Sequence, residues 1–100
     1  MSKLPTLSGA QKSRLRSLGQ TLADSLRLGR AGLTPALLAE LNRQLDTRGL
    51  VKVRFESPDR LARAALCDAL AAQALCMCVG SVGHTALFWR AGDAGGRLLV

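Results

Sequence analysis

The spacing of hydrophobic residues predicts a helix near the start of the chain. Leu15, Leu18 and Leu22 recur at helical intervals and form one apolar stripe. Ser8 and Gln11 precede this stripe and stand three residues apart, which is the spacing of a capping box at a helix N-terminus. We therefore expect the first helix to begin just after Ser8, with its leucine stripe facing the core.

A short strand and a second helix are expected next. Residues 25–28 alternate polar and apolar side chains, as a strand does. Thr34 and Pro35 suit the N-cap and first turn of a helix, and Gly49 suits a C-terminal cap. These signals bound a helix over residues 35–47. Its predicted inward face consists of Leu37, Leu38, Leu41 and Leu45.

The six residues that follow alternate in polarity and predict a second strand. Val51, Val53 and Phe55 share one face of it, whereas Lys52 and Arg54 share the other. The pattern indicates a half-buried strand with a basic outer face.

The rest of the chain predicts a third helix, a hairpin and a tail. The run Ser57-Pro58-Asp59 combines a cap, a first-turn proline and an early acid, so a helix is expected from there to about residue 74. Residues 76–82 and 85–90 are expected to pair as antiparallel strands around a turn at Gly83-His84. Residues 92–96 are rich in glycine and are expected to be flexible. The predicted apolar face of the third helix consists of Leu61, Ala65, Leu66, Ala69 and Leu70.

In order, these elements are a helix followed by a βαβαββ run. Strand–helix–strand units need crossover connections, so the sequence predicts one domain of the α/β (α+β sandwich) class. We expect a four-stranded mixed sheet with helices packed on it. The order of the strands within the sheet does not follow from the pattern.

The chain is strongly basic, which indicates the kind of partner that it binds. Its 100 residues include 14 Lys or Arg and 7 Asp or Glu, a formal net charge of +7. Residues 1–58 hold ten of these cations and four of the acids, so the basic surface is built mainly from the first half. This balance favours a polyanionic partner, either a nucleic acid or an anionic membrane surface.

The sequence does not predict export or a membrane span. Its first residues lack the apolar segment of a signal peptide. Residues 69–89 carry no formal charge, but polar side chains and a turn signal interrupt them, so no transmembrane helix is expected. We therefore expect a cytoplasmic protein with no membrane partner.

The segment before the second helix is the clearest candidate for a binding function. Gly29-Arg30-Ala31-Gly32 places two glycines three residues apart around an arginine. Glycine permits positive φ and close approach of another molecule, and the amides at a helix N-terminus favour an anion. This loop can contact a phosphate. A purely structural turn would use the same glycines, so both interpretations stay open on spacing alone.

Catalytic and metal-binding constellations are missing from the sequence. His84, the single histidine, falls at the expected hairpin turn, and no nucleophile elbow, zinc-protease or Walker motif is present. The loop also lacks the third glycine and the acidic residue of a dinucleotide fingerprint. Cys67, Cys76 and Cys78 are interpreted as buried free thiols, with a metal site that includes His84 as the alternative. We expect no enzyme activity, cofactor, metal or small-molecule substrate.

The loop and the second strand together resemble a known family, the CRM domain (chloroplast RNA splicing and ribosome maturation), in its single-domain bacterial YhbY-type form. The resemblance covers about residues 7–91. It implies a flexible N-terminus over 1–6, an RNA-binding domain over 7–91 and a flexible tail over 92–100. It also implies a fold similar to the C-terminal domain of translation initiation factor 3. The matching stretches are residues 15–18, 29–34, 40, 45, 50–54, 83–85 and 88–90.

The resemblance implies a non-catalytic RNA-binding protein. Bacterial members of the family are linked to precursors of the large ribosomal subunit, so ribosomal RNA is the implied partner. Gly29 and Gly32 would shape the loop, and Arg30 would contact phosphate. The implied RNA-binding set is Gly29, Arg30, Ala31, Gly32, Lys12, Arg16, Arg27, Lys52 and Arg54.

Two other functions stay open at this point. One is a duplex-DNA-binding protein, and the other is a protein-interaction module whose basic face docks on an acidic partner. Charge alone does not separate them from RNA binding, but the loop and the resemblance favour RNA. Phe55, Phe88 and Trp89 are the only aromatic residues, so stacking of single-stranded bases is expected to be a minor mode. We expect a monomer.

Overall fold

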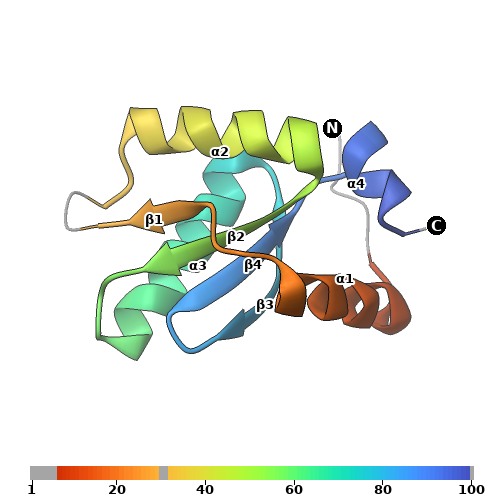
Figure 1. Ribbon diagram of the computed structural model, residues 1–100. Coiled ribbons are helices and arrows are strands. Elements are labelled where there is room, and N and C mark those ends of the chain that lie inside the picture. Colours follow the sequence, from red (N-terminus) through yellow and green to blue (C-terminus); the bar gives the residue numbers. More distant parts are fainter. Residues whose placement is uncertain (1–6, 30–31, 100) are drawn as a thin grey trace.

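The computed structural model describes residues 7–29 and 32–99, which form a sheet with helices packed on both faces (Figure 1). The elements are α1 (Gly9–Thr21), β1 (Leu26–Leu28), α2 (Pro35–Arg48), β2 (Leu50–Phe55), α3 (Arg60–Ala74), β3 (Met77–Val82), β4 (Thr85–Trp89) and α4 (Asp93–Arg97). The predicted helix and βαβαββ run are confirmed, and α4 is an addition that the sequence pattern did not indicate.

The sheet is four-stranded and mixed, as expected, with the strand order β1-β2-β4-β3. β1 and β2 are parallel, whereas β4 pairs antiparallel with both β2 and β3. α2 is the crossover between β1 and β2. The parallel pairing places the carboxyl ends of β1 and β2 at the same end of the sheet, where the chain leaves β1 toward α2 (Figure 1).

Alternation along the central strands creates a core on each face of the sheet. Val51, Val53 and Phe55 of β2 pack in one core with residues of α2 and α3. Leu50 of β2 packs instead in the second core, together with Leu15 of α1. The sheet is therefore a layer between α2 and α3 on one face and α1 on the other.

The predicted caps of α1 and α2 are confirmed. The Gln11 N–H donates to the Ser8 hydroxyl at 3.1 Å, and the Ser8 N–H donates to the Gln11 side chain at 2.9 Å. The Leu37 N–H donates to Thr34 Oγ1 at 3.1 Å at the start of α2. Gly49 ends that helix with φ 78°, a left-handed conformation that favours glycine.

The predicted apolar stripe of α1 is only partly correct. Leu15 is fully buried, but Leu18 is 37% exposed. Leu15 and Gly19, one turn apart, are the buried residues of the helix. α1 packs closely on the sheet at Gly19, where a Cβ would come within 2.2 Å of the Leu87 side chain.

The predicted apolar face of α3 also needs correction. The helix begins at Arg60 with Asp59 as its N-cap, and the Leu61 N–H donates to the Asp59 carboxylate at 3.0 Å. Leu61 is therefore in the first turn, and it is 80% exposed. The buried residues of α3 are Cys67, Leu70 and Ala74.

The glycine-rich stretch expected to be flexible forms α4 and packs on the body of the protein. The Trp89 indole Nε1–H donates to the Gly95 carbonyl oxygen at 3.0 Å. A Cβ at Gly95 would lie 1.9 Å from the Arg90 carbonyl oxygen, and a Cβ at Gly49 would lie 2.3 Å from the Gly95 nitrogen. The composition of this segment suggested flexibility, whereas the structure shows that Gly95 permits close backbone packing.

The uncharged stretch over residues 69–89 is divided between the end of α3 and the strands β3 and β4. Within the described ranges, no helix has the length and apolarity needed to cross a membrane.

Gly95→Ala tests the packing of α4. The added methyl group would overlap the Arg90 carbonyl, so we expect a loss of about 1–3 kcal/mol in the free energy of unfolding, measured by urea denaturation. Gly96→Ala is the matched control, because a Cβ there meets nothing within 4 Å, and it should change stability by less than about 0.5 kcal/mol. Equal effects of the two substitutions would contradict the close packing.

Candidate functional site

The loop over residues 29–32 lies between β1 and α2 in the chain. The Gly32 N–H donates to the Gly29 carbonyl oxygen at 3.0 Å, and Gly32 has φ 71°. Thr34 caps α2 two residues later. Because Pro35 has no N–H and the Leu37 N–H donates to Thr34, the cap already satisfies much of the first turn of this helix. Arg30 and Ala31, the other two predicted loop residues, lie outside the described residues.

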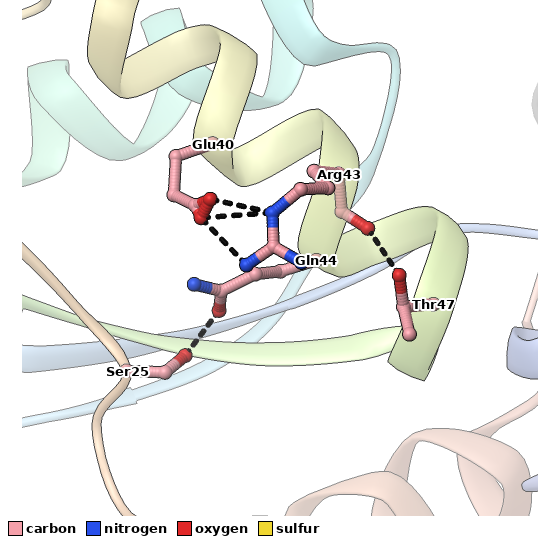
Figure 2. Close-up of polar contacts among 5 residues, drawn as sticks. All are labelled: Ser25, Glu40, Arg43, Gln44 and Thr47. Carbon is pink, nitrogen blue, oxygen red and sulfur yellow. Dashed lines mark hydrogen bonds and ion pairs between the residues drawn. The ribbon is translucent and has the colours of Figure 1, made fainter.

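Hydrogen bonds at both ends of β1 hold the start of this loop in place. Before the strand, the Ser25 N–H donates to the Lys52 carbonyl at 3.1 Å, and the Ser25 hydroxyl donates to the Gln44 side chain of α2 (Figure 2). After it, the Glu56 N–H donates to the Leu28 carbonyl at 3.0 Å. Gln44 is buried, so its bond to Ser25 satisfies a polar group inside the protein.

Three of the predicted cations lie together on one face of the sheet. Arg27 and Arg54 pair in register across the parallel strands, so their side chains project from the same face. Lys52 lies two residues before Arg54 and shares that face. The pair that follows Arg27 and Arg54, Leu28 with Phe55, belongs to the core under α2 and α3. The three cations therefore lie on the opposite face, the one that carries α1.

α1 adds Arg16 to this surface. The Arg16 Nη1–H donates to the Val79 carbonyl of β3 at 3.4 Å. The aliphatic stem of Arg16 lies over Gly80, where a Cβ would come within 2.9 Å of Arg16 Cδ. We refer to Arg16, Arg27, Lys52 and Arg54 as the basic face.

A groove of about 420 Å³ lies between α1 and the strands, next to the basic face. We call it the α1 groove. Arg16 and Lys52 belong to its walls, so two members of the basic face border it directly. Its other walls include Gln20, Gly80, Val82 and Leu87.

Lys12 is less closely connected to this surface. It lies one helical turn before Arg16, is half-buried, and is not among the residues that line the α1 groove. The structure thus brings Arg16, Arg27, Lys52 and Arg54 together and leaves Lys12 at the margin.

An acidic residue that the sequence analysis did not single out for the site lies between the loop and the basic face. Glu56 forms an ion pair with Arg27 at 3.7 Å, and both side chains are substantially exposed. A Cβ at Gly29 would lie 3.3 Å from Glu56 Oε2, so the carboxylate is also beside the loop. The sequence does contain a sign of this placement. Glu56 comes directly after the basic strand, and side chains 52, 54 and 56 of an extended chain share a face.

A second hollow, of about 480 Å³, lies at the start of α3 beside the turn between β3 and β4. Arg60 and Arg63 line it together with Ser81 of β3. Arg63 also donates to the Ser57 carbonyl at 3.0 Å, which ties it to the turn before the helix. The charge pattern of the sequence did not indicate this pair, because the second half of the chain has little net charge.

Two other arginines form ion pairs within the protein. Arg43 forms a two-pronged ion pair with Glu40 one turn earlier on α2 (Figure 2), and the shortest N–O distance is 2.6 Å. The hydrogen bond from Arg43 lowers the pKa of the Glu40 carboxyl group. Arg90 bonds to Asp46 at 3.1 Å and also to the Asn42 side chain and the Ala74 carbonyl. Arg90 therefore joins α2, α3 and β4 at the end of the sheet away from the loop.

The thiols differ in exposure. Cys67 and Cys76 are buried as expected, but Cys78 is exposed on the edge strand β3, which corrects the expectation of three buried thiols. A hydrogen bond with Cys67 lowers the pKa of the Cys78 thiol to about 7, whereas burial raises that of Cys76 to about 11. In the described part of the chain, no three His, Cys, Asp or Glu side chains are grouped to hold a metal ion.

Comparisons with known proteins agree on one family. The model of the CRS1 / YhbY (CRM) domain matches residues 7–90. A Pseudomonas aeruginosa protein named as a probable RNA-binding protein is 39% identical over 84 residues, which cover 84% of this chain and 81% of that protein. An RNA-binding protein of Haemophilus influenzae is 31% identical over 87 residues, which cover 87% of this chain and 88% of that protein.

A solved structure supports the fold independently. The solution structure of a hypothetical Staphylococcus aureus protein, described as a candidate RNA-binding protein, matches with a TM-score of 0.78. The match covers 88% of this chain and 92% of that chain at 23% sequence identity. At this identity the likeness concerns the fold, and it agrees with the predicted α/β class and mixed sheet.

Proposed function

This chain belongs to the CRS1 / YhbY (CRM) domain family, and from that premise we propose that it is a non-catalytic RNA-binding protein. Its basic face and the loop over residues 29–32 hold the phosphate backbone of a structured RNA. Two relatives that cover most of the chain are named as RNA-binding proteins, which favours RNA over duplex DNA or an acidic protein partner.

The observation that carries the proposal is the arrangement of cations on the open sheet face. Arg27 and Arg54 are cross-strand neighbours. Lys52 lies two residues before Arg54 in β2, on the same face. The side chains of Lys52 and Arg54 have no hydrogen-bond or ion-pair partner among the residues that the structure describes, so their charges remain available to a ligand. Cations held at fixed positions on a rigid sheet suit phosphate contacts, which position an RNA without reading its sequence.

The loop supplies a second kind of phosphate contact. Gly29 and Gly32 lie shortly before the N-terminus of α2, where the helix dipole favours an anion. Arg30 is proposed to reach the same phosphate. Because Glu56 lies beside both the loop and Arg27, it weakens the positive potential at this junction.

The biological target that we propose is ribosomal RNA in precursors of the large ribosomal subunit, bound in the cytoplasm by a monomer. The family resemblance supports this target. A surface dominated by backbone contacts also suits a folded RNA, because A-form helices present phosphates and 2′-hydroxyl groups more readily than base edges.

The double substitution Lys52→Gln with Arg54→Gln tests the basic face. Each phosphate contact that is lost should reduce the slope of log affinity against log salt by about 0.7–0.9, so the pair should reduce it by about 1.4–1.8. The measurement is the affinity for a structured RNA hairpin at several salt concentrations.

The control for that experiment removes the same charge elsewhere. Arg48 and Arg97 are exposed and lie in the last turns of α2 and α4. Arg48→Gln with Arg97→Gln should leave the slope nearly unchanged. An equal loss of slope in both double variants would show that only net charge matters and would contradict a defined site.

Glu56→Gln should strengthen RNA binding. The substitution removes a negative charge beside the loop and releases Arg27 from its ion pair, and at a separation of several ångströms in water this is worth about 0.5–1 kcal/mol. We expect the dissociation constant to fall by about two- to fivefold at low salt. Asp68→Asn, which removes an exposed acid from α3, is the control and should have little effect. Weaker binding of the Glu56 variant would contradict this placement of the RNA.

The ribosomal target is tested by sedimentation of cell lysate on a low-salt sucrose gradient. We expect the protein to migrate with particles slightly lighter than the mature large subunit, and RNase or moderate salt should release it because the contacts are ionic. A protein that stays at the top of the gradient under every condition would contradict the ribosomal target and leave RNA binding to be assigned elsewhere.

A further inference from the structure

Two of the residues that line the α1 groove are glycines, and each lets a neighbouring side chain lie close to the backbone. At Gly80, a Cβ would come within 2.9 Å of Arg16 Cδ and 3.0 Å of Arg16 Cγ, so glycine lets the arginine stem lie flat against the strand. At Gly19, the lack of a side chain lets α1 approach Leu87 closely. The hollow that remains, about 420 Å³, is within the size range of small-ligand sites.

The chemistry of the groove is apolar inside and cationic at its borders. Leu87 and Gly80 contribute apolar surface, and Val82 is 83% exposed at the rim. Arg16 and Lys52 come from different elements, α1 and β2, and both line the groove. Gln20 adds a side-chain amide, which can donate to and accept from the edge of a ligand.

We propose that the α1 groove receives one unpaired nucleobase of the bound RNA, with Arg16 and Lys52 holding the phosphates on either side of it. This inference rests on the proposed RNA-binding function and makes it more specific. A base has an apolar face and a polar edge, and in RNA it is flanked by two phosphates, so it matches the apolar walls, the Gln20 amide and the two cations of the groove. A base within a continuous duplex is stacked and cannot enter a hollow of this kind. The preferred RNA is therefore a helix interrupted by a bulge.

Three RNA hairpins of equal stem length test the proposal with the complete protein. One has a continuous stem, the second has a single-nucleotide bulge, and the third has the same bulge without its base. We expect the bulged RNA to bind about fivefold more tightly than the other two. This is the low end of the effect of stacking a base on an aromatic side chain, because the groove offers aliphatic contacts instead.

A fluorescent base reports directly on the groove. With 2-aminopurine at the bulge, wild-type protein should change the fluorescence on binding. Gly80→Ala adds a methyl group that would come within 2.9 Å of Arg16 Cδ, so it should abolish the preference for the bulge. Because Arg16 also belongs to the basic face, the affinity for the continuous stem should fall as well, but by less than the affinity for the bulged RNA. Gln20→Ala changes an exposed residue of α1 without affecting the fold, and it should reduce the same preference in part.

The outcomes separate this inference from the proposed function. Equal affinity of wild-type protein for all three RNAs, or a preference for the continuous stem, would overturn the base-binding role and leave backbone binding intact. Equal affinity for the bulge with and without its base would overturn it as well. Failure to bind any of the three RNAs would count against the proposed RNA-binding function itself.

Discussion

The register between β1 and β2 is the constraint on which the rest of the structure depends. Leu28 pairs with Phe55 in the larger core, and Arg27 pairs with Arg54 on the opposite face. A shift of one residue in β1 would turn Arg27 into that core and expose its leucine neighbours, and burying an unpaired charge is costly. The same alternation of apolar and basic residues along the strands therefore buries the core and exposes the basic face. The bond between Ser25 and the buried Gln44 adds a polar anchor for the same register.

The size and position of α1 decide how much of that face remains open. Leu15 and Gly19 are the buried residues of the helix, whereas Lys52 lines the groove and Arg54 is exposed. Had α1 been broader in its apolar contact, the cations of β2 would have been covered. Arginines at the two ends of the sheet have different roles. Arg90, at the end away from the loop, bonds to three partners and stabilises the fold. The surface that we propose for RNA is thus the part of the sheet that the helices leave exposed.

Local signals in the sequence predicted most of the elements. Caps such as Ser8, Thr34 and Gly49 act within one turn of the chain, and strand alternation depends only on neighbouring residues, so both can be found without tertiary information. The strand order could not be found in this way, because the lengths of the connections allow several arrangements. α4 was missed because it depends on the bond from Trp89 to Gly95 and on a close approach of two glycines. The same limit applies to the site: the loop and the basic strand are visible in the sequence, whereas the α1 groove and the place of Glu56 require segments that are distant along the chain to be brought together.

The most direct test of the basic face as the RNA-binding surface is to follow the backbone amide chemical shifts while a structured RNA hairpin is added. We expect the largest changes in β1, β2, the part of α1 around Arg16 and the residues that flank the loop. The amides of α4 and of the C-terminal half of α2 should remain nearly unchanged. Changes concentrated in α4 and the end of α2, with β1 and β2 unaffected, would contradict RNA binding at the basic face.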